Sequence, residues 1–369
     1  MMTEARLEYN YLGNSGVRVS NLCLGTMTFG KTATGTGVSP TQADEELSFK
    51  IMDRFAEMGG NFLDTANVYG LGLSETIVGK WLAKHERKLF VLATKVRGTM
   101  DKDNVNAVGL SRRHIVESCE ESLARLQTPY IDLYQSHVWD NATNLDETLR
   151  TFDDLIRCGK VRYFGASNVC GWQLQKIVDR IDAMGLNKCV SLQQQYNLLC
   201  RQSEFEEFMV CENEGIGILP WSPLKGGMLT GKFKRDSKPD PTGSRIGFVH
   251  TDEAKAMQSA PAWSKLNGDE GFWALIDVME AAAKNHGQTV PRVALRWLLQ
   301  KPRVSSVIIG ATSVAQLEDN VAASKGWSLT EEEMSQLDAV SPRVTLYPYE
   351  MIWRINGPRN NPFARSSQP

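Results

Sequence analysis

The sequence has no apolar run as long as the roughly 20 residues that a membrane-spanning helix needs. Its first residues, MMTEARLEYNYLG, carry charge early and contain no apolar segment typical of a secretory signal. An excess of basic residues is also missing, because 41 lysines and arginines stand against 43 aspartates and glutamates, for a formal net charge of -2. We therefore expect no membrane insertion and no nucleic-acid partner.

The seven cysteines form no CxxC pair and no cluster with histidine at the spacing of zinc ligands. We expect no metal site, and free thiols in apolar stretches favour a reducing, cytoplasmic location. The G-x-G-x-x-G pattern of an open dinucleotide-binding sheet is absent from every strand–turn–helix unit. With 42% hydrophobic residues the chain has the composition of an ordinary globular protein.

Short apolar runs alternate along the chain with longer segments of helical periodicity. The eight strand candidates span residues 19–26, 61–66, 89–96, 131–137, 161–168, 191–197, 215–221 and 305–311. The eight helix candidates are 43–58, segments opening at Ser74 and Ser111, 145–158, 172–184, 204–213, 271–285 and 314–323. This alternation predicts an α/β fold, a closed (β/α)8 TIM barrel, with an open doubly wound sheet as the alternative.

Three further segments flank or interrupt the repeat. Residues 9–20 predict an N-terminal β-hairpin, turned at GNSG and placed to cap the barrel floor. Residues 225–268 predict a long loop after the seventh strand, typical of a functional lid or a disordered tract. After Thr330 we expect one C-terminal helix and then an irregular tail over 341–369, partly packed on the barrel and disordered in about its last ten residues. The whole chain, 1–369, is expected to form one domain.

Four polar residues stand at the end of predicted strands or in the loop that follows, where barrel enzymes place their working groups. They are Asp64, Tyr69, Lys95 and His137. A phenol with a pKa near ~10 is a reluctant acid, but a neighbouring ammonium eases its proton release. A carboxylate would keep that ammonium charged and oriented, and an imidazole could hydrogen-bond a carbonyl oxygen. The set suits protonation of a carbonyl during hydride transfer.

Each of these residues also has an ordinary structural interpretation. An aspartate in a loop is commonly a turn former, a tyrosine at a strand end packs the rim, and a terminal lysine is solvated. A lone histidine is more often structural than catalytic. The joint placement on the second to fourth strands favours the catalytic interpretation.

The ordered motifs of the chain resemble those of the aldo-keto reductase superfamily over about residues 9 to 340, including its potassium-channel beta-subunit branch. The resemblance is carried by YLGNSGVRVSNLCLGTMTFG, NFLDTANVYGLGLSETIVGKWL, LATKV, QSH, GASN, QQYNLL, WSPLKGGMLTGK and IIGATSVAQLEDN, in family order. It implies that Tyr69 is the general acid, that Lys95 and Asp64 tune it, and that His137 orients the carbonyl.

The same resemblance implies a nicotinamide cofactor held by residues at strand ends. Ser167, Asn168 and Gln193 would hold the carboxamide, and Trp221 would stack on the ring. The residues bordering the ribose and reaction centre would be Gly25, Thr26, Met27 and Asp64.

Two later segments would hold the phosphates. The pyrophosphate path would be lined by Ser222, Leu224, Gly226 and Lys232. The adenosine-phosphate segment would consist of Gly310, Thr312, Ser313, Gln316 and Asn320, at a helix start that suits an anion. Many relatives have Arg or Lys directly after the serine, whereas this chain has Val314. NADP (NADPH) is the expected cofactor, as in most of the family, and NAD is the alternative.

Aromatic residues near the predicted loop ends, namely Phe29, Tyr69, Trp139 and Trp221, predict an aromatic-rich pocket for a small-molecule carbonyl substrate. No cluster of cations indicates a strongly anionic substrate. The leading hypothesis is an NADP-dependent reductase of aldehydes and ketones. The alternatives are a cofactor-binding regulatory subunit of a potassium channel, and a barrel isomerase or lyase acting on phosphorylated sugars. A homo-oligomer is compatible with each.

Overall fold

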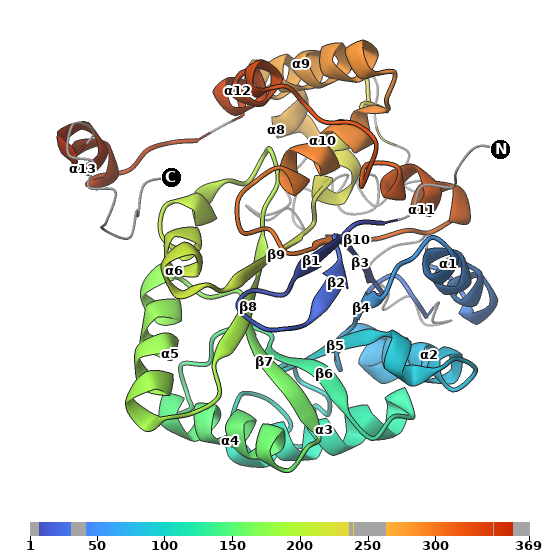
Figure 1. The fold of residues 1–369 in the computed structure, drawn as a ribbon, viewed down its shortest axis with the longest axis vertical. Coiled ribbons are helices and arrows are strands. Elements are labelled where there is room, and N and C mark those ends of the chain that lie inside the picture. Colours follow the sequence, from blue (N-terminus) through green and yellow to red (C-terminus); the bar gives the residue numbers. More distant parts are fainter. Residues whose placement is uncertain (1–6, 31–41, 236–238, 240–262, 342, 357–369) are drawn as a thin grey trace.

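The computed structural model describes residues 7–30, 42–235, 239, 263–341 and 343–356. Eight parallel strands form its central sheet (Figure 1). They are β3 (Leu22–Gly25), β4 (Phe62–Asp64), β5 (Val91–Val96), β6 (Ile131–Ser136), β7 (Val161–Ser167), β8 (Cys189–Gln195), β9 (Gly217–Trp221) and β10 (Val307–Ile309). Their order is β10-β3-β4-β5-β6-β7-β8-β9.

The two edge strands of this sheet approach each other and nearly close the ring. Ile218 of β9 forms a parallel bridge with Val304, just before β10. Its amide donates to the Arg303 carbonyl and its carbonyl accepts from the Ser305 amide, each at 2.9 Å. The (β/α)8 barrel predicted from the alternation of strands and helices is therefore confirmed, and the open doubly wound sheet is excluded.

A two-stranded hairpin covers one end of this barrel. It consists of β1 (Tyr9–Tyr11) and β2 (Arg18–Ser20), which pair antiparallel. Its turn sits against the starts of β8 and β9, because a Cβ added to Gly13 would lie 2.3 Å from the Val190 carbonyl oxygen and 2.7 Å from the Gly217 nitrogen. Leu12 and Val19 reach into the interior apolar cluster. The hairpin thus plugs the barrel floor, as the sequence predicts.

The inside of the barrel changes from apolar to polar along the strands. Phe62, Ala93, Leu133 and Leu219 belong to one buried apolar cluster together with the hairpin residues. Side chains two positions apart on a strand point to the same side. The next inward residues toward the carboxyl ends are therefore Asp64, Lys95, Gln135 and Trp221. The polar groups of the barrel meet at the end away from the hairpin.

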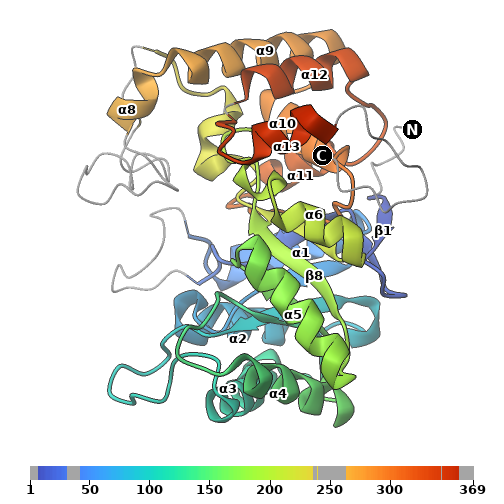
Figure 2. The ribbon, with the colours of Figure 1, turned by 90° about the vertical axis from the view of Figure 1, so that its left-hand side faces the viewer.

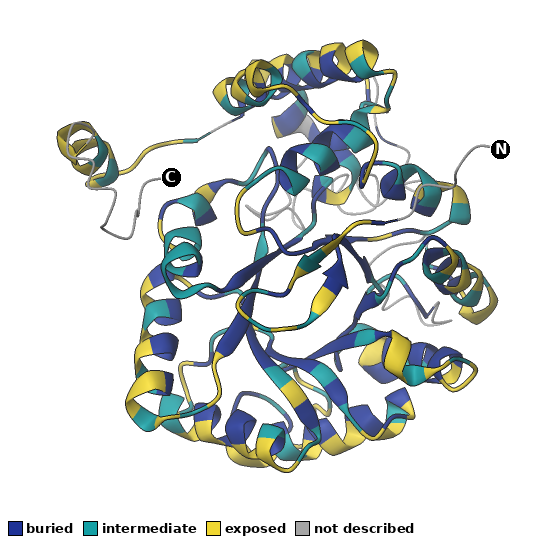
Figure 3. Ribbon diagram, in the orientation of Figure 1, coloured by how far each residue is buried: buried dark blue, intermediate teal, exposed yellow. Residues whose placement is uncertain are grey.

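Helices surround the strands, most with buried faces inward and exposed faces outward, while α13 stands apart and has no buried residue (Figures 2 and 3). They are α1 (Glu45–Glu57), α2 (Leu73–Leu82), α3 (Arg112–Leu126), α4 (Leu145–Arg157), α5 (Gly171–Met184), α6 (Glu207–Glu214), α8 (Trp263–Asn267), α9 (Glu270–His286), α10 (Val290–Leu299), α11 (Val314–Val321), α12 (Glu331–Val340) and α13 (Tyr349–Asn356). Short 3-10 turns are η1 (Tyr69–Gly72), η2 (Arg87–Leu89), η3 (Gln202–Glu204) and η4 (Lys225–Thr230). None of the described helices is both long and apolar enough to cross a membrane.

Side-chain caps fix where several helices begin. Ser111 accepts a hydrogen bond from the His114 amide at the start of α3, as its position in the sequence indicates. Thr330 and Glu333 form a capping box that starts α12. These local signals explain why most helix starts follow from the sequence.

Two helices outside the predicted loop over 225–268 were not predicted. Residues 290–299 were assigned to no element, yet they form α10, with Pro291 in the first turn, where a proline leaves no intrahelical hydrogen bond unmade. The tail was predicted to be irregular, yet residues 349–356 form α13. Trp353 of this helix stacks on Phe205 with ring centroids 5.6 Å apart, and Tyr349 donates a 2.5 Å hydrogen bond to Glu206. The tail therefore packs back on the barrel, as expected, but as a helix.

The predicted loop over 225–268 is partly ordered. It begins with η4 and ends in α8. The interpretation of its middle as a lid lies outside the described residues, and so does the expected disorder at the end of the tail.

Candidate active site

Neighbouring strands place the inward polar residues side by side. Asp64 is in register with Ala93 of β5, and Lys95 is in register with Gln135 of β6. His137 follows β6, and its amide donates to the Val96 carbonyl at 3.0 Å. The carboxyl ends of β4, β5 and β6 thus present three of the four predicted catalytic residues around one point.

The ammonium of Lys95 lies at the centre of this group. Its Nζ donates to Asp64 Oδ1 at 2.5 Å, to the Thr65 carbonyl at 2.8 Å and to the Tyr69 hydroxyl at 3.2 Å. The side chain is fully buried. Burial alone would lower the pKa of Lys95, but the charge of Asp64, with a further contribution from Tyr69, outweighs it and leaves this pKa raised. The lysine is therefore a permanent cation beside the phenol.

The carboxylate of Asp64 is held by donors from both sides of the barrel. Its Oδ2 accepts hydrogen bonds from Gln193 Nε2 at 2.9 Å and from Gln135 Nε2 at 3.1 Å. The Thr26 amide donates to the Asp64 carbonyl at 2.9 Å, which ties the end of β3 to the same residue. Asp64 thus has little freedom to move away from Lys95.

Tyr69 and His137 face the open side of this cluster. Tyr69 begins η1 after β4, and its ring meets the His137 ring edge to face, with centroids 5.9 Å apart. Burial, followed by the charges of Lys95 and Arg97, lowers the pKa of His137 to about 3. The imidazole is therefore neutral at ordinary pH and can donate a hydrogen bond to a substrate oxygen without carrying charge.

The residues predicted to hold the nicotinamide ring adjoin this group. Ser167 of β7 is in register with Gln193 of β8. Asn168 has a φ of +52°, donates to the His137 carbonyl at 2.8 Å and accepts from Trp221 Nε1 at 3.2 Å. The Asn168 amide is thus engaged by the protein, and it fixes the Trp221 indole at the end of β9. Gly25, Thr26 and Met27 follow at the end of β3.

The predicted phosphate segments lie after β9 and β10. Ser222, Leu224 and Gly226 lead into η4, and no atom lies within 4 Å of a Cβ added to Gly226. Lys232 lies over the Phe233 ring, with its Nζ 5.0 Å from the centroid. None of these residues has a hydrogen bond to the Asp64–Lys95 group among the described residues.

The segment after β10 opens α11. Ser313 is the N-cap, and its hydroxyl accepts from the Gln316 amide at 3.2 Å. Gln316 Oε1 accepts from the Thr312 amide at 2.9 Å, and Asn320 donates to the Gly310 carbonyl at 3.3 Å. A Cβ at Gly310 would also meet no atom within 4 Å, so open space adjoins this helix start.

Sequence reasoning missed some members of the site. Gln135 contacts Asp64, and the Thr65 carbonyl contacts Lys95. Gln135 could have been found in the sequence, because it is a polar residue within the otherwise apolar strand IDLYQSH. Arg97, two residues beyond Lys95, was also passed over. Phe29 is fully buried in the outer core and bridges Ala43, and its place near the pocket stays a prediction.

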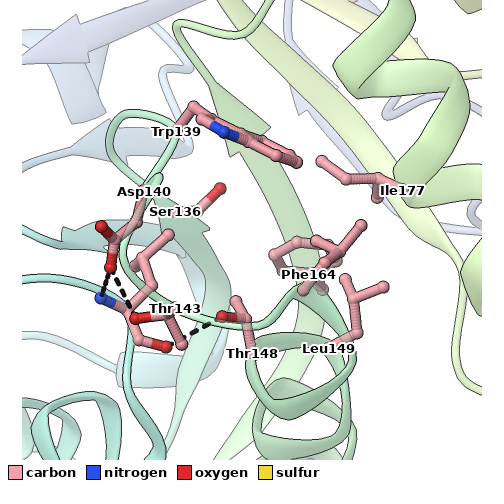
Figure 4. Close-up of a pocket in the computed structure, with 10 residues that line it drawn as sticks. Ser136, Trp139, Asp140, Thr143, Thr148, Leu149, Phe164 and Ile177 are labelled. Atoms are coloured by element: carbon pink, nitrogen blue, oxygen red, sulfur yellow. Dashed lines mark hydrogen bonds between the residues drawn. The ribbon is translucent and has the colours of Figure 1, made fainter.

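Trp139, in the loop after β6, contacts a second tryptophan, Trp172 of α5. The ring of Trp139 meets that of Trp172 with centroids 5.7 Å apart, and 58% of Trp172 is exposed. Beside Trp139 lies a small cavity of about 20 Å³, lined by Ser136, Asp140 and Phe164 among others (Figure 4). That volume holds about one water molecule, so this cavity is not a substrate site.

Comparison with known proteins agrees with this geometry. The model of the aldo/keto reductase family matches residues 21–342. The chain belongs to the aldo/keto reductase family. Among the described residues of this family member, no group of three or more His, Cys, Asp or Glu side chains is arranged to hold a metal ion.

Three curated relatives show the range of the aldo/keto reductases that are similar to this chain. An uncharacterized oxidoreductase of Bacillus subtilis is 36% identical, with 91% of this chain and 96% of the relative covered. A versiconal hemiacetal acetate reductase of Aspergillus parasiticus is 31% identical, with 93% and 100% covered. A Schizosaccharomyces pombe protein named "Putative voltage-gated potassium channel subunit beta" is 32% identical, with 94% and 96% covered.

Proposed function

We propose that this protein reduces aldehydes and ketones to alcohols with NADPH, and that Tyr69 is the general acid. The observation that carries the proposal is the position of the Lys95 ammonium, 2.5 Å from Asp64 and 3.2 Å from the Tyr69 hydroxyl. A fixed cation beside a phenol stabilises the phenolate and so favours proton release. Membership of the aldo/keto reductase family supports carbonyl reduction in general.

In this proposal each group has one task. When bound, the reduced nicotinamide supplies the hydride that adds to the carbonyl carbon. Tyr69 gives its hydroxyl proton to the carbonyl oxygen as negative charge develops there. Lys95 stabilises the phenolate that is left, and Asp64 holds Lys95 in place. His137 donates a hydrogen bond that orients the carbonyl oxygen.

The residues present fit a dinucleotide. Open space adjoins Gly226 and Gly310, where a phosphate chain needs close approach to the backbone. Lys225 and Lys232 have no ion pair with a carboxylate among the described residues, and burial lowers the pKa of Lys225. The N-terminus of α11 adds backbone donors. Ser167, Asn168, Gln193 and Trp221 would border the nicotinamide.

NADPH is the proposed cofactor, because the family generally uses a nicotinamide and mostly the phosphorylated form. Val314 offers no charge to a 2′-phosphate, so NADH stays the alternative. A cytoplasmic location, expected from the free thiols, also stays a prediction.

The test is a titration of the purified protein with NADPH and NADH, followed by a panel of carbonyl compounds monitored by loss of nicotinamide absorbance. We expect saturable binding of NADPH and turnover of aromatic aldehydes. Cofactor binding without turnover of any aldehyde or ketone would contradict the reductase. Absence of any change in nicotinamide fluorescence would instead favour an isomerase or lyase.

A second function is favoured by the likeness to the relative named as a potassium channel subunit beta. Intact Asp64, Tyr69, Lys95 and His137 are compatible with a cofactor-binding regulatory subunit of such a channel. That role predicts co-purification with a membrane protein and negligible turnover on the same panel.

A further inference from the structure

Arg97 occupies an unusual position beside the candidate active site. It directly follows β5, two residues after Lys95, and its φ of +155° is one that side-chain-bearing residues rarely adopt. Its carbonyl accepts from the Gly109 amide at 2.9 Å, and the preceding carbonyl, of Val96, accepts from the His137 amide at 3.0 Å. The hydrogen bonds from Gly109 and His137 therefore fix the backbone that carries the Arg97 side chain.

The guanidinium of Arg97 is half-buried, and one of its nitrogens lacks a protein partner. Its Nε is buried and has no hydrogen-bond partner, and no ion pair joins Arg97 to a carboxylate among the described residues. An unsatisfied buried donor costs about 1–3 kcal/mol, and more when it is charged. The Arg97 Nε–H can therefore donate to an acceptor on a bound ligand.

The carboxylate that acts on Arg97 electrostatically is Asp140, and its oxygens are already occupied. Its Oδ2 accepts from the Leu110 amide and the Thr143 hydroxyl, each at 2.7 Å (Figure 4). Its Oδ1 accepts from the Ala142 amide at 3.1 Å. Arg97 and Asp140 therefore act on each other through space, and no hydrogen bond joins their side chains among the described residues. Lys95, by contrast, is fully paired with Asp64.

The Arg97 charge adjoins the backbone that holds His137, because the Val96 carbonyl accepts from the His137 amide at 3.0 Å. Arg97 is among the charges that act on the His137 ring, which meets the Tyr69 ring edge to face. The planar fork of a guanidinium matches a carboxylate in geometry. One guanidinium without a direct carboxylate contact matches a singly charged carboxylate better than a phosphate monoester, which carries about -1.5 to -2.

We propose that Arg97 binds a carboxylate on the substrate, so that the protein prefers carbonyl compounds that carry one acidic group. The proposal rests on the proposed reductase function and names its substrate class. Trp139, in the same loop as His137, suits an aromatic ring that joins the carbonyl and the carboxylate of such a substrate. Arg97 would then determine specificity and take no part in proton transfer.

The test uses the full-length protein with NADPH and matched pairs of aldehydes: 2-, 3- and 4-carboxybenzaldehyde and their methyl esters. Wild type should reduce at least one acid roughly 10-fold or more better in kcat/KM than its ester, the range expected for a hydrogen bond to a charged group. Arg97→Gln should abolish this preference, chiefly through KM, and leave the ester nearly unchanged. Arg97→Lys should retain part of it.

Arg113→Gln is the matched control, since it removes an exposed arginine of α3 and changes the net charge equally. It should leave the preference intact. Equal reduction of acid and ester by wild type, or a preference that survives Arg97→Gln, would overturn the proposal.

A second readout separates this proposal from the reductase itself. Benzoate binding to the NADPH complex is measured by calorimetry in wild type and Arg97→Gln. If no aldehyde is turned over, the proposed reductase function is contradicted. Benzoate binding that is lost in Arg97→Gln would still support the anion site at Arg97. Benzoate binding that is absent, or equal in both proteins, would count against the anion site.

Discussion

The Nζ of Lys95 lies 2.5 Å from Oδ1 of Asp64, and the side chains are 0% and 3% exposed. A buried ion pair of this kind contributes little net stability, because both charges lose their hydration. Its value is positional, since Asp64 holds the cation against the Tyr69 hydroxyl. The predictions below test that arrangement and the cofactor segments around it.

Tyr69→Phe removes the proposed proton donor and keeps the ring. We expect carbonyl reduction to fall roughly 100-fold or more, in line with the contribution of a positioned acid. NADPH affinity, measured by fluorescence titration, should stay nearly unchanged. Tyr11→Phe, at an exposed position on the floor hairpin, is the control. Equal activity of Tyr69→Phe and the parent would show that the proton comes from another group.

Asp64→Asn leaves the Lys95 ammonium buried without its counter-charge. We expect the free energy of unfolding, measured in urea, to fall by about 3–5 kcal/mol. Lys95→Met on its own should also be destabilising, but the double variant Asp64→Asn/Lys95→Met should lose less than the sum of the two. Strictly additive losses would mean that the two side chains do not interact as the structure shows.

The neutral state of His137 predicts acid lability. Its pKa is about 3 in the folded protein and ordinarily about 6.5 in an unfolded chain. Between these values the unfolded chain binds a proton that the folded protein does not, so stability falls as pH falls, by at most about 1.4 kcal/mol per pH unit. His137→Gln should flatten this part of the curve from about pH 6 to 4, whereas His85→Gln, outside the barrel, should not. Identical pH profiles for His137→Gln and wild type would contradict the assignment.

The preference for NADPH over NADH tests whether the segment at the start of α11 binds the 2′-phosphate. Gln316→Ala and Ser313→Ala should weaken NADPH more than NADH, because only NADPH would place a phosphate there. Val314→Arg should strengthen NADPH roughly 10-fold by adding a charged donor. Val344→Arg adds the same charge at an exposed position and is the control. Unchanged discrimination between the two cofactors in all three variants would refute the phosphate assignment.

Local patterns in the sequence were sufficient for much of the fold. Apolar runs with polar ends predicted all eight barrel strands, and the GNSG turn predicted the floor hairpin. Ser111 and Thr330 mark helix starts by chemistry that acts within one turn. The strand ends also singled out Asp64, Lys95 and His137 as candidates, because parallel strands deliver their carboxyl ends to one face.

Only the tertiary structure decided which groups meet and how they are balanced. Gln135 and Gln193 donate to Asp64 from 71 and 129 positions away, a contact set by the closure of the ring. The helix at 349–356 gains its partner Phe205 in the same way. Arg97 looks like an ordinary solvated residue in the sequence, and becomes informative only because its neighbours bury Nε and occupy Asp140. Periodicity acts over a few residues, whereas burial and charge balance depend on the folded chain as a whole.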